Sequence, residues 1–84
     1  MTDDVYAHLR HLLDELKEFG GLEQADIAER TGMNPTTVSR FLTGQQETLP
    51  YDKGRAIEAL YQANAELIKT KKIDKLRAIE ASLQ

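Results

Sequence analysis

The stretch QADIAERTGMNPTTVSRFLTG, residues 24–44, predicts two short helices joined by a tight turn. Apolar residues at helical spacing favour a helix over residues 24–31, and Gly32 can adopt the left-handed conformation that ends it. Asn34 can then cap a second helix through its side-chain oxygen. Pro35 suits the first position of that helix, because its missing N–H needs no partner there.

The second helix, residues 35–43, has two contrasting faces. Val38, Phe41 and Leu42 recur at helical spacing and supply a buried face. The outward positions carry hydrogen-bonding side chains and no carboxylate, namely Asn34, Thr36, Thr37, Ser39, Arg40 and Thr43. Such a face fits the major groove of DNA, where the base edges offer donors and acceptors. Arg40 is the one long donor, and we expect it to read a guanine; a phosphate clamp is its alternative role.

These residues carry a resemblance to a known family. The stretch resembles the helix-turn-helix of the lambda-repressor-like (phage repressor and Cro) family, without an insertion, at Leu22, Gln24, Ile27, Ala28, Gly32, Met33, Asn34, Thr37, Val38, Ser39, Arg40, Leu42 and Gly44. The resemblance extends more loosely over residues 9–60, since that family has one helix before the motif and at least one after it. It implies an all-α domain of four to five helices that binds double-stranded DNA.

The resemblance also implies contacts outside the second helix. Gln24 occupies a position that contacts a phosphate in that family, and Gln45 and Gln46 lie where its loop reaches the DNA backbone, with a polar linker as an equal alternative. Lys53 and Arg55, independently, are bases near the motif that can meet a phosphate. The predicted DNA-binding set is Gln24, Asn34, Pro35, Thr36, Thr37, Ser39, Arg40, Thr43, Gln45, Gln46, Lys53 and Arg55.

Composition limits the class of protein. The 84 residues suffice for one domain with a small core. There is no cysteine, which excludes disulfides and thiolate metal sites and makes a reducing cytoplasm the expected compartment. No apolar run approaches the roughly 18 residues of a membrane span, and the acidic start MTDDVYAH is unlike a signal peptide. A soluble cytoplasmic protein is predicted.

The net charge is −3, from 11 basic and 14 acidic residues, whereas DNA binding usually calls for a basic surface. The acids gather in the first helix and the bases in the tail, while residues 35–43 carry only Arg40 as a charge. The predicted recognition helix is therefore not repelled by phosphates, although non-specific DNA affinity should be weak.

Catalytic and metal-binding chemistry finds little support. His8, His11 and Glu15 share one side of the first helix and give a metal site as one interpretation, but solvated histidines are the preferred one because no further ligand completes the set. There is no glycine-rich phosphate loop, and nucleophiles and bases are scattered. We expect no enzyme activity, no metal and no cofactor.

Helices are also expected on both sides of the motif. The first, capped by Thr2, Asp3 or Asp4, should run to about Glu18 on a leucine-rich face. After a polar loop, Asp52 should cap a fourth helix, with Leu49 and Tyr51 anchoring the loop on the core.

The predicted organisation is a DNA-binding domain over residues 1–68 and a helical extension over residues 69–84. The extension carries an apolar stripe, Ile73, Leu76, Ile79 and Leu83, turned away from the face that includes Ile57, Leu60 and Ile68. Either a break near Thr70 folds the stripe back onto the domain, or the stripe meets a partner. We expect the second outcome, with the stripe as a homodimer contact. The tail's basic residues are expected to be solvated or to pair with the acidic first helix of another chain, with DNA contact as the alternative.

These features predict a sequence-specific transcription regulator of phage, prophage or bacterial type, which binds a near-palindromic operator as a dimer and represses by occupancy. The alternative is a protein-binding module on the same fold, such as an antirepressor, an antitoxin or an adapter. The acidic balance suits that alternative.

Overall fold

The computed structural model describes residues 3–83 and shows five α-helices and no strand among them: α1 (Asp3–Glu18), α2 (Gln24–Thr31), α3 (Pro35–Thr43), α4 (Tyr51–Ala63) and α5 (Ala65–Leu83). The predicted all-α fold with a helix-turn-helix is confirmed. The helix cap predicted at Thr2, Asp3 or Asp4 falls outside the described residues and side chains.

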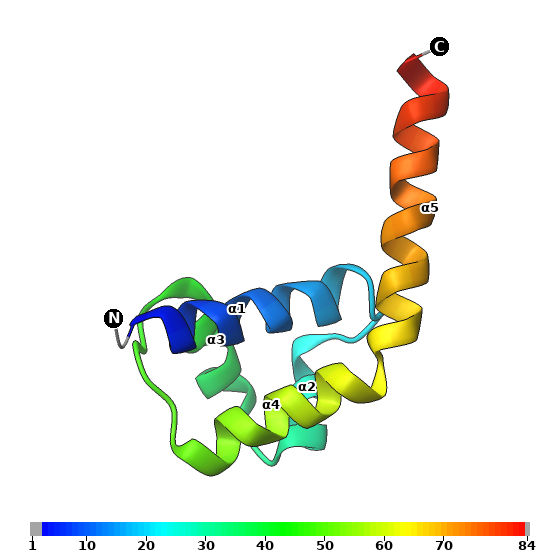
Figure 1. The fold of residues 1–84 in the computed structure, drawn as a ribbon. Coiled ribbons are helices and arrows are strands. Elements are labelled where there is room, and N and C mark those ends of the chain that lie inside the picture. The colour runs from blue at the N-terminus through cyan, green and yellow to red at the C-terminus, as the bar shows by residue number, and fades with distance from the viewer. Residues whose placement is uncertain (1–2, 84) are drawn as a thin grey trace.

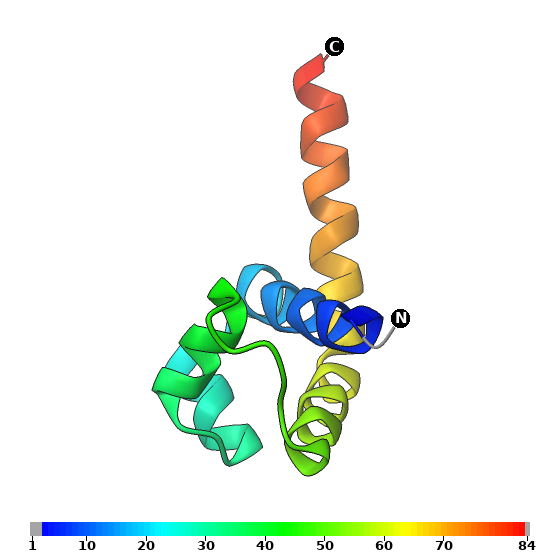
Figure 2. The same ribbon diagram turned by 90° about the vertical axis from the view of Figure 1, so that its left-hand side faces the viewer.

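Helices α1 to α4 surround one apolar core, and α5 rises away from it (Figure 1). Leucines at i, i+3, i+4 and i+7 along α1 form one wall of this core, because that spacing puts them on one helix face. The buried set is Leu9, Leu12, Leu13, Leu16, Ile27, Ala28, Met33, Val38, Phe41, Leu49, Ile57, Leu60 and Ile68. The projecting α5 makes the molecule 46 Å long against 27 and 19 Å across (Figure 2).

Helix ends follow the predicted turn chemistry within the motif. Gly32 and Gly44 have φ of 73° and 83°, the left-handed conformation, and close α2 and α3. The Asn34 side chain accepts a hydrogen bond from the Thr36 backbone N–H at 2.8 Å, with Pro35 at the first helical position. The sequence therefore sets the bounds of both motif helices locally.

The loop before α4 differs from the prediction in two respects. The N-cap is Pro50, so the prediction that Asp52 caps the helix is wrong; Asp52 lies one residue inside α4. Leu49 is buried as expected, but Tyr51 is 81% exposed and does not anchor the loop. Leu49 alone therefore attaches this loop to the core.

The alternative of a break near Thr70, with the stripe folded back onto the domain, is not what the structure has. The interruption lies at Asn64, with φ −113° and ψ 7°, and α5 runs without interruption through residues 69–72. Asn64 donates its side-chain amide to the Leu60 carbonyl at 2.9 Å, and its own carbonyl accepts from the Ile68 N–H at 3.0 Å. One residue thus ends one helix and starts the next, and the stripe of α5 does not fold back.

The basic residues of α5 pair with the acids of α1 in the same chain rather than requiring another chain. Lys72 contacts the Glu15 carboxylate, and Lys75 lies 2.6 Å from that of Glu18. Glu15 is buried and also accepts a hydrogen bond of 2.5 Å from the Tyr61 hydroxyl of α4. A buried carboxylate on α1 therefore joins three helices.

The stability of the fold should depend on the ionisation of Glu15. Burial alone raises the pKa of this carboxyl, but hydrogen bonds from Lys72 and Tyr61, with the charges of Lys72 and His11, outweigh burial and hold the pKa below its ordinary value of 4.5. A lowered folded-state pKa adds stability above the unfolded value and loses it as the pH falls through the folded value. Glu15→Gln should therefore lower the free energy of unfolding at pH 7, and its deficit against the native chain should shrink below pH 4.5.

Urea unfolding from pH 7 to pH 3 measures this difference, with Glu18→Gln in the exposed pair as the matched control. A Glu15→Gln deficit that stays constant over this range contradicts the prediction.

Candidate nucleic-acid interface

The exposed side of α3 is the centre of the candidate interface. Val38 and Phe41 are fully buried and fix the helix on the core, so the opposite side faces solvent. Thr36, Arg40 and Thr43 are exposed at i, i+4 and i+7 and form one line along that side. The structure thus brings the long donor and two hydroxyls onto one exposed surface of α3.

The remaining predicted residues of α3 lie at its start and along its flank. Asn34 and Pro35 are exposed at the amino end, where recognition helices approach base edges. Thr37 and Ser39 are only half-exposed, because they flank the buried Val38. Thr37 and Ser39 are therefore less accessible than Thr36 and Thr43.

Two of these polar groups already have a partner inside the chain. The Asn34 side-chain oxygen is used in the helix cap, which leaves its amide N–H groups as free donors. The Thr43 hydroxyl donates to the Ser39 carbonyl at 3.1 Å. It can still accept a hydrogen bond from outside, so both side chains keep part of their capacity.

The loop after α3 is held in shape by hydrogen bonds. The Gln46 backbone N–H donates to the Arg40 carbonyl at 3.1 Å, and its side-chain amide donates to the Thr48 carbonyl at 3.0 Å. Gln45 is exposed beside it. Of the two predicted loop residues, Gln46 therefore has a structural role and Gln45 is the more accessible to a ligand.

The bases of α4 differ in the same way. The Lys53 ammonium donates to the Gly32 carbonyl at 3.0 Å and so satisfies the last turn of α2, which sequence analysis did not predict. Arg55 is exposed at the first turn of α4. Lys53 joins α4 to the turn of the motif and places a positive charge there.

Gln24 is half-buried at the first position of α2 and has acidic neighbours. Asp26 accepts a hydrogen bond from the Glu23 backbone N–H at 3.1 Å, which forms part of a capping box. Two carboxylates therefore already complement the positive end of the α2 dipole. A phosphate at Gln24 meets fewer free N–H groups than at an uncapped helix start.

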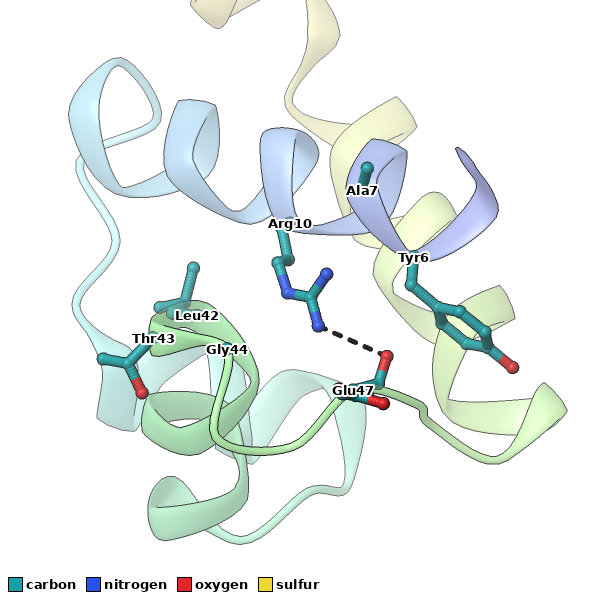
Figure 3. Close-up of a pocket in the computed structure, with 7 residues that line it drawn as sticks. All are labelled: Tyr6, Ala7, Arg10, Leu42, Thr43, Gly44 and Glu47. Atoms are coloured by element: carbon teal, nitrogen blue, oxygen red, sulfur yellow. Dashed lines mark hydrogen bonds between the residues drawn. The ribbon is translucent and has the colours of Figure 1, made fainter. Parts of the chain in front are cut away.

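Arg10 of α1 is a residue of the site that sequence analysis missed. Its guanidinium donates to the carbonyls of Phe41 at 2.8 Å, Gln46 at 3.1 Å and Glu47 at 3.2 Å, and lies 4.5 Å from the centre of the Phe41 ring. Figure 3 shows it reaching from α1 to the end of α3 and the following loop. A positive charge at the carboxyl end of a helix is also favourable.

The groove around Arg10 has a volume of about 580 Å³ and is open to solvent. Tyr6, Ala7, Leu42, Thr43, Gly44 and Glu47 complete its lining. The signal for this role in the sequence was weak, because Arg10 is simply one of two Lys or Arg residues, with Lys17, in an acidic helix. Because the partners of Arg10 are backbone carbonyls more than thirty positions away, no residue pattern marks them.

Two other kinds of site, a metal centre and a membrane span, are also relevant to residues 3–83. His11 lies 3.0 Å from Glu15, but no three His, Asp or Glu side chains in the described part of the chain gather as metal ligands. Among the helices described, none combines the length and apolar character needed to cross a membrane.

One comparison with known protein families agrees with this geometry. A family model described as a helix-turn-helix domain matches residues 8–69, from within α1 to the first turns of α5. The chain belongs to this family of helix-turn-helix domains, a class that binds DNA. No significant match was found among curated proteins or among solved structures.

Arg10 should contribute to stability through the carbonyls that it satisfies. Arg10→Met keeps an apolar stem but removes all donors, and we expect it to lower the free energy of unfolding by about 1–3 kcal/mol. The free energy of unfolding of Arg10→Lys should lie between those of the native chain and Arg10→Met, because lysine keeps the positive charge but lacks the planar set of guanidinium donors. Chemical denaturation measures both, with Lys17→Met on the exposed side of α1 as the control, expected within about 0.5 kcal/mol of the native chain. Equal losses of unfolding free energy in Arg10→Met and Lys17→Met would show that the hydrogen bonds of Arg10 do not stabilise the fold.

Proposed function

We propose that this chain is a sequence-specific DNA-binding transcription regulator of the lambda-repressor-like type, acting in the cytoplasm of a bacterium as a host or phage-encoded repressor. The observation that carries the proposal is the exposed line of Thr36, Arg40 and Thr43 on a helix without a carboxylate. Arg40 reads a base, the hydroxyls of the same face add modest discrimination, and repression follows from occupancy of the operator.

The DNA backbone contacts in this proposal come from residues around α3. Arg55 and Gln45 are exposed, and their side chains show no hydrogen bond or ion pair within the described residues. Lys53 and Gln46 would combine a phosphate contact with a structural hydrogen bond, and Gln24 would make its contact from a half-buried position. Few positive charges take part, so affinity should depend less steeply on salt than for a strongly basic domain. Specific contacts must then supply a large share of the binding energy.

A protein-binding module on the same fold is the second candidate. The observation that favours it is the net charge of −3, which opposes non-specific DNA binding. A binding selection on random DNA duplexes at moderate salt separates the two functions. A regulator returns a motif with two half-sites, whereas a module that binds only protein returns none.

Arg40 provides the sharpest test of the recognition helix. Arg40→Ala should remove about 1–3 kcal/mol of discrimination at one position of each half-site and leave the fold intact, because the side chain is exposed. Binding titrations against operators with each base at that position measure the change, and circular dichroism checks the fold.

Arg30→Ala is the matched control, since Arg30 is an exposed arginine on α2 outside the predicted set. If Arg40→Ala lowers the affinity for all DNA sequences equally, Arg40 contacts a phosphate and does not read a base. An unchanged preference would move recognition to another surface.

The regulator is proposed to act as a homodimer on half-sites about 34 Å apart, joined through the end of α5. Ile73, Leu76, Ile79 and Leu83 are 40%, 58%, 47% and 81% exposed, so the stripe is unburied in the single chain. A helix that projects without packing is marginal in water, and a second copy of the stripe would stabilise it. Residues 69–84 then form the dimerisation segment and residues 1–68 the DNA-binding domain.

Removing the stripe should separate folding from dimerisation. A chain stopped after Thr70 keeps Ile68 in the core and should remain folded, sediment as a monomer and lose cooperative binding to the operator. Leu76→Gln with Ile79→Gln is the matched variant, because it leaves Lys72 and its contact with α1 in place. Sedimentation velocity and operator titrations measure both. Shortened chains that stay dimeric would place the interface elsewhere.

A further inference from the structure

The direction of α5 is determined by few contacts. Asn64 is the only residue between α4 and α5, and its backbone leaves the helical conformation. Ile68, 1% exposed, holds the first turn of α5 in the core. Beyond Ile68, Lys72 and Lys75 are the side chains of α5 that form hydrogen bonds with α1 in the described part of the chain. An apolar anchor at one turn fixes the start of a helix but leaves its direction to contacts further along.

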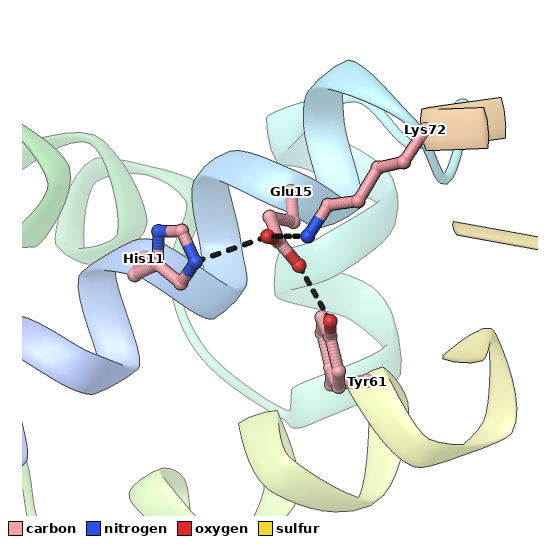
Figure 4. Close-up of polar contacts among 4 residues, drawn as sticks. All are labelled: His11, Glu15, Tyr61 and Lys72. Carbon is pink, nitrogen blue, oxygen red and sulfur yellow. Dashed lines mark hydrogen bonds and ion pairs between the residues drawn. The ribbon is translucent and has the colours of Figure 1, made fainter. Parts of the chain in front are cut away.

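Glu15 is placed to supply that direction. Figure 4 shows His11, Tyr61 and Lys72 converging on its carboxylate from α1, α4 and α5. The side chain is 6% exposed, the Tyr61 hydroxyl donates to one oxygen at 2.5 Å, and Lys72 and His11 contact the other oxygen. His11 lies on α1 itself, but Tyr61 and Lys72 come from α4 and α5. The carboxylate can satisfy both of these donors only when α5 keeps this angle.

The neighbouring pair of Lys75 and Glu18 lacks these properties. Both side chains are more than half exposed, at 55% and 54%, although their separation is only 2.6 Å. Water screens an exposed pair and lets its long side chains move, so breaking it costs little stability. Removing the cation from a buried carboxylate costs much more, because the carboxylate is then left uncompensated. The two pairs therefore join the same helices but differ in how firmly they hold α5.

Lysine stems complete the contact. The ammonium groups of Lys72 and Lys75 lie 5.8 Å and 5.5 Å from the centre of the Phe19 ring at the end of α1. At this distance the cation–π contacts are weak, so they contribute little to fixing the angle of α5. The buried carboxylate remains the directional element.

We propose that Glu15 is a positioning residue which sets the angle of α5 to the helix-turn-helix domain through Lys72 and Tyr61. The consequence for DNA rests on the proposed function: if the stripe at the end of α5 joins two copies, the angle of α5 determines how two recognition helices are spaced. Glu15 would then act on operator spacing without contacting DNA.

The chain suits a direct measurement of this angle because it contains no cysteine. Spin labels at Glu29→Cys in α2 and Arg77→Cys in α5 occupy exposed positions that take no part in the Glu15 contacts. Dilution into an excess of unlabelled protein confines the measured distances to single chains. Double electron–electron resonance then reports the mean distance between α2 and α5 and its spread.

The labelled native sequence should give one narrow distance distribution. Lys72→Ala, which keeps a helix-forming residue, should broaden the distribution or shift its mean, and Glu15→Gln should do the same. Lys75→Ala is the matched control and should leave the distribution nearly unchanged. Circular dichroism confirms that each variant is folded; should Glu15→Gln unfold, Lys72→Ala still tests the proposal because Glu15 keeps Tyr61 and His11 as partners.

A Lys72→Ala distribution as narrow as the native one, with the same mean, overturns the proposal. So does a Lys75→Ala protein that broadens as much as Lys72→Ala, because the exposed pair would then hold the helix equally. In operator titrations, Lys72→Ala should lose cooperativity or change the preferred half-site spacing while keeping affinity for one half-site. If the distances change as expected but no DNA sequence is bound, positioning stands and the proposed function fails.

Discussion

The burial of Phe41 is the interaction on which the rest of the structure depends. Its ring is fully buried, and the ring centre lies 6.4 Å from that of Tyr6 in an edge-to-face arrangement. The Arg10 guanidinium lies over the same ring and donates a hydrogen bond to the Phe41 carbonyl. Truncating a buried phenylalanine to alanine costs about 3–5 kcal/mol, which is comparable with the whole stability of a small domain. One residue thus joins α3 to α1, and its burial turns Thr36 and Arg40 outward.

Charge is used inside the molecule more than its net value of −3 suggests. Arg10 satisfies carbonyls, Lys53 satisfies the end of α2, and Lys72 partners the buried Glu15. Each of these bases joins elements that are distant in sequence. In the proposed function, with so few free bases near α3, specificity would come from directed hydrogen bonds made by the hydroxyls and the one arginine of α3.

Sequence reasoning predicted the candidate interface best where the chemistry is local. The cap at Asn34 and the first position of Pro35 follow from neighbours along the chain, and the structure has both. The roles of Arg10, Lys53 and Glu15 could not be predicted, because their partners lie 21 to 57 positions away and are partly backbone carbonyls. No periodicity in a sequence marks such contacts.

The sequence by itself determined the helices and the two faces of α3, since helical spacing, caps and left-handed glycines act over a few residues. The tertiary structure decided where the fourth helix ends and which way α5 points. The shift of the apolar stripe left a break near Thr70 as an alternative, whereas the interruption lies at Asn64. Ile68 explains the difference: it must reach the core, so the chain turns before it, and Lys72 can then reach the buried Glu15.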